Sequence, residues 1–119
     1  MKHGVFESPQ LAKRVAVYIG ESDKWHGAPL YEAIVLKARE LHLAGATVLR
    51  GPMGFGANSR IHTAKILRLS EDLPIVVEIV DADAKVAALI PHLKEMVKGG
   101  LVTIEDVGVL IYSPSRSSS

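Results

Sequence analysis

The sequence contains no cysteine, and this absence removes several kinds of site at once. Disulfide bonds, thiolate nucleophiles and zinc sites with cysteine ligands are all excluded. Long hydrophobic runs are also absent: no stretch approaches the ~20 apolar residues that cross a bilayer. The first ten residues, MKHGVFESPQ, lack the apolar centre of a signal peptide. We therefore expect a cytoplasmic protein.

A strong excess of one charge is missing too. Lysine and arginine number 14 and aspartate and glutamate 13, which gives a formal net charge of +1. Such a balance argues against a general nucleic-acid or membrane-surface binder, so any anion site must be local. Hydrophobic residues make up 48% of the 119 residues and charged residues 23%. This length and composition are typical of one globular domain with one core.

Four segments have the residues and spacing of β-strands. Alternating polarity and β-branched residues predict a first strand over 11–19. Shorter or more continuous runs of β-favouring residues predict further strands over 46–50, 73–80 and 101–112.

Two segments have the three-to-four-residue apolar spacing of amphipathic helices. The first begins at Pro29, and Gly45 is expected to supply a left-handed cap just after its end. The second follows Asp81 and Asp83, which can cap it, and Pro91 predicts a kink or a break within it. The two apolar stripes consist of Leu30, Ile34, Ala38 and Leu41, and of Val86, Leu89, Ile90, Leu93 and Val97.

The order of these elements is strand, helix, strand, strand, helix, strand. This βαββαβ order is the pattern of a ferredoxin-like α+β domain, with a four-stranded antiparallel sheet and both helices on one face. Apolar strand residues on the uncovered face predict self-association. We assign residues 1–10 to an N-terminal segment, 11–112 to the domain and 113–119 to a flexible serine-rich tail.

The segment 51–69, between the second and third strands, is the main candidate for function. It has little periodicity, and long loops within a domain are typically functional or disordered. Backbone N–H groups at glycines and arginine side chains both bind phosphate oxygens. A local anion site is therefore indicated by the cations and glycines in and beside this segment, namely Arg50, Gly51, Gly54, Gly56, Arg60, Lys65 and Arg68.

Two stretches carry a resemblance to a known family. GATVLRGPMGFG and SRIHTAKILRLSEDLPIVVEIVD, and with them residues 18–112, resemble the domain-of-unknown-function family DUF190, which is related to the nitrogen regulatory PII signalling proteins. PII proteins are ferredoxin-like homotrimers that bind adenine nucleotides in clefts between subunits. The resemblance implies a regulatory homotrimer, not an enzyme, that binds AMP, ADP or ATP. It also implies that the long loop acts on a partner, such as a membrane transporter or an enzyme.

The resemblance further implies a set of ligand-binding residues. Gly54, Phe55 and Gly56 match a glycine-phenylalanine-glycine element at the foot of the long PII loop. Gly99 and Gly100 lie where a second PII loop would contact phosphates. The expected nucleotide site consists of Arg50, Gly51, Gly54, Phe55, Gly56, Ser59, Arg60, His62, Thr63, Gly99 and Gly100.

Other interpretations of these residues stay open. Trp25 lies in the loop after the first strand, where its indole would stack on a base or pack in an interface. His26 and His62 would be ligands in a metal-binding trimer of the divalent-cation-tolerance type. In a third interpretation the chain is a nucleotide-acting enzyme, with Arg60 and His62 as transition-state donors. We assign no catalytic residue and no metal site.

Overall fold

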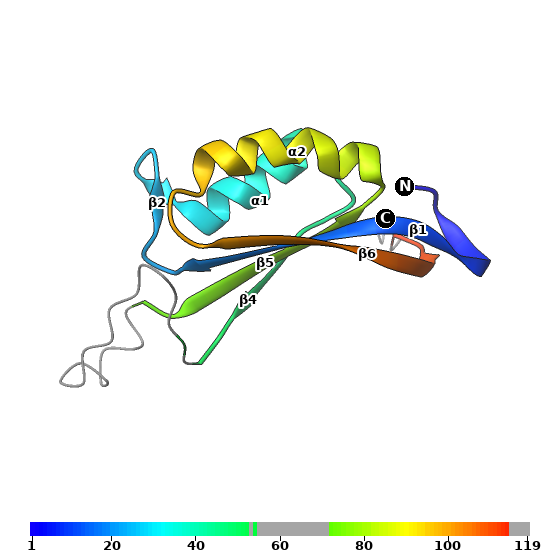
Figure 1. Cartoon of the computed structure of the whole chain (residues 1–119), viewed down its shortest axis with the longest axis horizontal. Coiled ribbons are helices and arrows are strands. Elements are labelled where there is room, and N and C mark those ends of the chain that lie inside the picture. The colour runs from blue at the N-terminus through cyan, green and yellow to red at the C-terminus, as the bar shows by residue number, and fades with distance from the viewer. Residues whose placement is uncertain (53, 55–71, 115–119) are drawn as a thin grey trace, which may run out of the picture.

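A four-stranded antiparallel sheet with two helices on one face is the frame of the protein (Figure 1). The structure, a computed structural model, describes residues 1–52, 54 and 72–114. Its strands are β1 (Gly4–Gly20), β2 (Lys24–Trp25), β3 (Ala28–Pro29), β4 (Thr47–Arg50), β5 (Pro74–Asp81) and β6 (Leu101–Tyr112), and its helices are α1 (Leu30–Glu40) and α2 (Asp83–Met96). The sheet has the order β4-β5-β1-β6, and β2 and β3 form a separate hairpin. This arrangement confirms the predicted ferredoxin-like fold. Neither helix is long and apolar enough to cross a membrane.

The core lies between the helices and one face of the sheet. β1 pairs with β5 on one side and with β6 on the other. Since successive side chains of a strand alternate between faces, every second residue of β1 and β5 points towards the helices. The predicted helix stripes meet these residues, with Leu41, Ile90 and Val97 at the margin. The buried core comprises Val15, Val17, Ile19, Leu30, Ile34, Ala38, Leu43, Ile75, Val77, Ile79, Val86, Leu89, Leu93 and Met96.

The end of α1 differs from the prediction. The left-handed residue is His42, with φ 61°, and not Gly45. The N–H of Leu43 donates to the carbonyl of Ala38 (3.0 Å) and the N–H of His42 to that of Arg39 (3.0 Å), which is the Schellman pattern. Leu43 is buried in the core, so the apolar contact that accompanies this motif outweighs the preference of glycine for the left-handed region.

The start of α2 differs too. Ala82 is the N-cap residue and no side chain caps the helix, so the capping role predicted for Asp81 and Asp83 is wrong. Further along, Pro91 lies within the helix and does not break it. Pro91 and Ala87 are both exposed, so the carbonyl that loses its hydrogen-bond partner lies on the solvent side.

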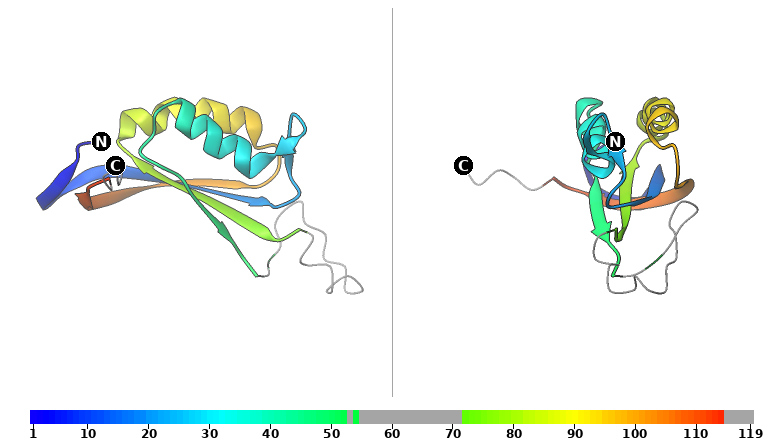
Figure 2. Two further views of the ribbon diagram at one scale, coloured as in Figure 1. Left: turned by 180° about the vertical axis from the view of Figure 1, so that it is seen from behind. Right: turned by 90° about the vertical axis from the view of Figure 1, so that its left-hand side faces the viewer.

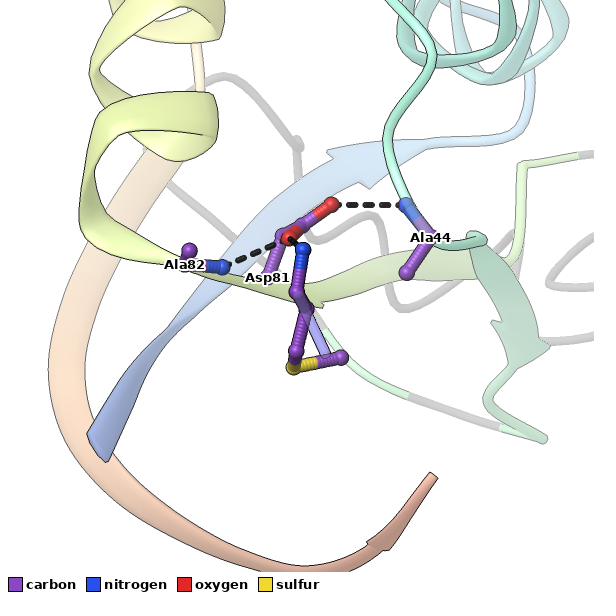
Figure 3. Close-up of polar contacts among 4 residues, drawn as sticks. Ala44, Asp81 and Ala82 are labelled. Carbon is purple, nitrogen blue, oxygen red and sulfur yellow. Dashed lines mark hydrogen bonds and ion pairs between the residues drawn. The ribbon is translucent and has the colours of Figure 1, made fainter. Parts of the chain in front are cut away.

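Asp81 instead joins three parts of the chain (Figure 3). Its carboxylate is 2% exposed. Oδ2 accepts a hydrogen bond from the backbone N–H of Ala44 (2.8 Å), and Oδ1 accepts one from that of Ala82 (2.6 Å). The terminal ammonium of Met1 lies 3.4 Å from Oδ1. Asp81 therefore fastens the connection between α1 and β4 to the junction between β5 and α2.

The first strand begins at Gly4, well before the predicted start at Leu11. Residues 4–11 of β1 run beside residues 108–112 of β6. Gly4, Val5, Gln10 and Leu11 are paired, and the register is irregular between Val5 and Gln10. We call these two segments the arm. Proline and serine near its middle are poor strand residues, which is why alternation alone predicts too late a start for the strand. The partner strand accommodates the proline through Gly108, where a Cβ atom would lie 2.7 Å from Cβ of Pro9.

Both helices cover one face of the sheet and leave the other face open (Figure 2). The open face carries an ion-pair network. Nη1 of Arg14 on β1 lies 3.2 Å from Oε2 of Glu78 on β5, and Arg14 also pairs with Glu105 on β6. On the helix-covered face, Lys13 pairs with Asp106, and this hydrogen bond and charge raise the pKa of the Lys13 ammonium. Around the Arg14 network the register places exposed apolar side chains, Tyr18, Leu49 and Leu101. Such a surface fits the self-association expected from the sequence.

We predict that Asp81→Ala destabilises the fold by about 1–3 kcal/mol, because two backbone N–H groups lose their acceptor at a poorly solvated position. The matched control is Asp83→Ala, which removes an exposed carboxylate from the first turn of α2 and should cost less than about 1 kcal/mol. Urea unfolding followed by circular dichroism gives both values. Equal losses for the two variants would contradict a joining role for Asp81.

Candidate functional site

Four strand ends meet at one end of the sheet, which we call the loop end. β1 and β4 finish there, and β5 and β6 begin there. The register sets Gly20 opposite Pro74, Arg50 opposite Ile75 and Tyr18 opposite Leu101. The segment predicted to hold the function, 51–69, connects β4 to β5 at this end. The loop end is therefore the candidate site.

Arg50 is the last residue of β4, and its guanidinium pairs with the carboxylate of Glu21. The backbone N–H of Glu21 donates to the carbonyl of Leu73 (2.8 Å), and the N–H of Gly51 donates to the carbonyl of Pro74 (2.8 Å). These bonds hold both members of the ion pair against the start of β5. The Arg50 guanidinium therefore lies at the loop end, and an anion that bound there would compete with Glu21 for it.

A side chain would be tightly placed at Gly54 and has no room at Gly100. A Cβ atom at Gly54 would lie 3.2 Å from Cγ of Pro74. At Gly100, φ is +144° and a Cβ atom would lie 2.6 Å from the carbonyl oxygen of Tyr18. Gly100 therefore requires glycine for two reasons, conformation and space. Its neighbour Gly99 is half-buried.

A groove of about 430 Å³ runs from Gly100 between α2 and β6. Its walls are mainly apolar, and Lys94 is its one cationic side chain. The groove thus places an ammonium beside the predicted phosphate-contacting turn. The lining residues are Ile90, Leu93, Lys94, Val97, Gly100, Val102, Thr103 and Ile104.

Within one chain the described residues of the predicted site fall into two halves that do not meet. Arg50, Gly51 and Gly54 are at the end of β4, which is one outer strand of the described sheet, whereas Gly99 and Gly100 precede β6, the other outer strand. Three strand spacings of about 4.8 Å separate the two edges, or about 14 Å. The two halves share one end of the sheet but lie at its opposite edges.

Trp25 lies in the β2–β3 hairpin at the loop end (Figure 1). Its indole is half-buried against the core, and its ring stacks on the imidazole of His26 with centroids 4.2 Å apart and planes 13° apart. His26 and Gly27 form the turn of the hairpin with φ of 49° and 81°. Among the described residues no group of three or more histidine or acidic side chains could hold a metal ion. Base stacking by Trp25 stays a prediction.

Several predicted site residues lie outside the described ranges. These are Phe55, Gly56, Ser59, Arg60, His62 and Thr63, together with Lys65 and Arg68. Their participation in the site stays a prediction from the sequence.

Sequence reasoning missed two residues of the candidate site, Lys94 and Glu21. The only signal for Glu21 is a carboxylate in the charged, glycine-bounded loop after the first strand. Nothing local relates it to Arg50, since the two residues belong to different strand ends and meet only through the pairing of β1, β5 and β4.

Comparison with known proteins gives a family. A family model described as Uncharacterized ACR, COG1993 (DUF190) matches residues 12–109. A UPF0166 protein of Aquifex aeolicus (strain VF5) is 35% identical over 98 residues, which cover 82% of this chain and 92% of the relative. A UPF0166 protein of Methanocaldococcus jannaschii is 34% identical over 99 residues, covering 82% and 91%.

A solved structure gives the fold relationship. CPII, a nitrogen regulatory PII-like protein from Thiomonas intermedia K12 bound to ADP, AMP and bicarbonate, matches with a TM-score of 0.64 at 14% identity. The match covers 85% of this chain and 90% of CPII. At this identity the likeness concerns the fold alone. The chain belongs to the DUF190 family, and its fold is PII-like.

Proposed function

We propose that the protein is a cytoplasmic, non-enzymatic sensor of adenine nucleotides that works as a homotrimer. The single observation that carries the proposal is that the two halves of the candidate site share the loop end but lie on opposite edges of the sheet. A site divided in this way becomes complete when the edges of two copies meet. The PII-like CPII, which was crystallised with ADP and AMP, supports an adenine nucleotide as the ligand.

The directions of the outer strands allow the sheet edges of two copies to pair. In the order β4-β5-β1-β6 every neighbouring pair is antiparallel, so β4 and β6 run in opposite directions. β6 of one copy can therefore pair with β4 of the next and continue the antiparallel sheet. This pairing would set the end of β4 beside the start of β6 and bring Arg50 close to Gly100 of the neighbouring copy. Repetition around a threefold axis closes the ring.

The chemistry of both edges fits this assembly. Exposed apolar side chains lie along β4, at Val48 and Leu49, and along β6, at Leu101, Val102 and Ile104. Burial of these side chains between copies would stabilise the ring. In the completed site, the guanidinium of Arg50, backbone N–H groups at the glycines and the ammonium of Lys94 would hold the phosphates.

The rest of the site comes from the sequence prediction. The segment that joins β4, which ends at Arg50, to β5 contains the remaining predicted residues, Phe55, Gly56, Ser59, Arg60, His62 and Thr63. A ligand that engages these residues would change the surface that segment 51–69 offers to a partner, such as a transporter or an enzyme. Neither ligand binding nor contact with the partner forms or breaks a covalent bond, so the proposed role is regulatory.

The first test is a thermal-shift titration with AMP, ADP, ATP and cyclic AMP, with and without magnesium. We expect at least one nucleotide to raise the melting temperature in a concentration-dependent way. At a nucleotide concentration of 100 times Kd, the free energy of unfolding should rise by about 2.7 kcal/mol. Arg60→Ala should abolish this rise, and the matched control Lys85→Ala, on α2, should retain it. If no nucleotide shifts the wild-type protein, the sensor proposal is wrong.

The Glu21 ion pair gives a second test. Glu21→Gln removes the charge that competes for Arg50 and should tighten nucleotide binding about 1.4- to five-fold, because a solvent-accessible ion pair is worth about 0.2–1 kcal/mol. The control Glu32→Gln, an exposed position on α1, should leave Kd unchanged. Isothermal titration calorimetry measures both. Binding that is equal to or weaker than that of the wild type would remove Arg50 from the proposed site.

A further inference from the structure

The turn of the β2–β3 hairpin carries an unusual residue. Trp25 pairs with Ala28, so His26 and Gly27 are the two residues of the turn, and their φ angles are 49° and 81°. Positive φ at both positions is the feature of type I′ turns, in which asparagine, aspartate or glycine is favoured at the first position. Histidine adopts this left-handed conformation at a cost, and strained backbone of this kind is concentrated at functional sites. The hairpin alone gives no reason for a histidine at this position.

The imidazole of His26 is presented as a flat surface. One of its faces lies on the indole of Trp25, with ring centroids 4.2 Å apart and ring planes 13° apart. The indole packs against the core and is therefore a firm support. His26 is exposed, so the other face of the imidazole is open to solvent. The two rings form a stack whose open side is the imidazole of His26 and not the indole of Trp25.

The loop that carries this stack is fixed to the rest of the chain. The backbone N–H of Leu30, at the start of α1, donates to the carbonyl of Asp23 (2.8 Å). The N–H of Gly20, at the end of β1, donates to Oδ2 of the same residue (3.0 Å). Asp23 thus ties the hairpin to both neighbouring elements. A ring held in this way loses little conformational freedom when a ligand binds to it, which favours affinity.

The loop also starts between the two halves of the candidate site. β1 ends at Gly20, between the start of β5 on one side and the start of β6 on the other, and the hairpin follows at the loop end (Figure 1). Glu21, the next residue, pairs with Arg50. His26 follows Glu21 by five residues, a span of at most about 18 Å even for an extended chain. The open face of the imidazole therefore lies in the neighbourhood of the Arg50 guanidinium.

We propose that the open face of His26 stacks on the purine base of the bound nucleotide, while Arg50 holds a phosphate. This inference rests on the proposed sensor function and adds the group that recognises the base. Histidine is one of the aromatic side chains on which bases stack, and stacking accepts any base because every base has a flat ring face. His26 would therefore distinguish a nucleotide from a phosphate compound without a base, and would not distinguish one purine from another.

Isothermal titration calorimetry with AMP, ADP and ATP, and with inorganic pyrophosphate, separates the base from the phosphates. His26→Asn removes the ring and suits the turn, because asparagine before glycine is favoured there. We expect Kd for the nucleotides to rise about 5- to 100-fold, as loss of one stacking contact does, and Kd for pyrophosphate to stay unchanged. The melting temperature should not fall.

The matched control is His42→Asn. His42 has the same left-handed backbone, with φ 61°, but lies beyond the far end of α1 from the hairpin. This variant should leave every Kd unchanged. His26→Phe keeps a flat ring without nitrogen atoms and should bind nucleotides more tightly than His26→Asn does. If the phenyl ring restores no affinity, His26 acts through its nitrogen atoms, and base stacking is wrong.

The remaining outcomes separate this inference from the sensor proposal. Nucleotide binding that is unchanged in His26→Asn would overturn base stacking and leave the sensor standing. Equal losses for the nucleotides and for pyrophosphate would overturn it too, because His26 would then affect the phosphates and not the base. A wild-type protein that binds neither AMP, ADP nor ATP would refute the sensor and base stacking together.

Discussion

The pairing of β1 on both sides is the constraint on which the rest of the structure depends. Its inward side chains, Val15, Val17 and Ile19, are the centre of the core, and a slip of one residue against either neighbour would turn them outward. The same pairing brings strand ends from distant parts of the chain together at the loop end. It also leaves β4 and β6 as the outer strands of the described sheet, so the central strand determines where other chains can attach.

Much of the fold could be predicted because its signals are local and repeated. The alternation of the last strand predicts its bounds, 101–112, correctly, and the helix stripes predict which helix faces are buried. Errors occur where a single residue decides the outcome. Gly45 is a better left-handed residue than His42 by local preference, but burial of Leu43 decides where α1 ends. Likewise Pro9 suggests a break, but the strand continues with an irregular register, and Gly108 leaves room for the proline ring.

The residue types of the candidate site can be proposed from the sequence, whereas their arrangement in space cannot. Glycines and an arginine at the foot of a long loop point to an anion site in any sequence. That Arg50 meets Glu21, and that Gly100 lies on the opposite edge, depends on strand order, which no local pattern encodes. The family resemblance supplies the expectation of a shared cleft, and the strand order supplies the geometric reason for one.

The division of the site between two edges has a consequence for mass action. If each cleft needs two copies, binding of a ligand and association of the chains are linked equilibria, and each must strengthen the other by the same factor. A dilute chain would then bind weakly, whereas an abundant one would bind at its full affinity. A protein with Arg50 and Gly100 on opposite edges would therefore respond to its own cellular abundance as well as to its ligand.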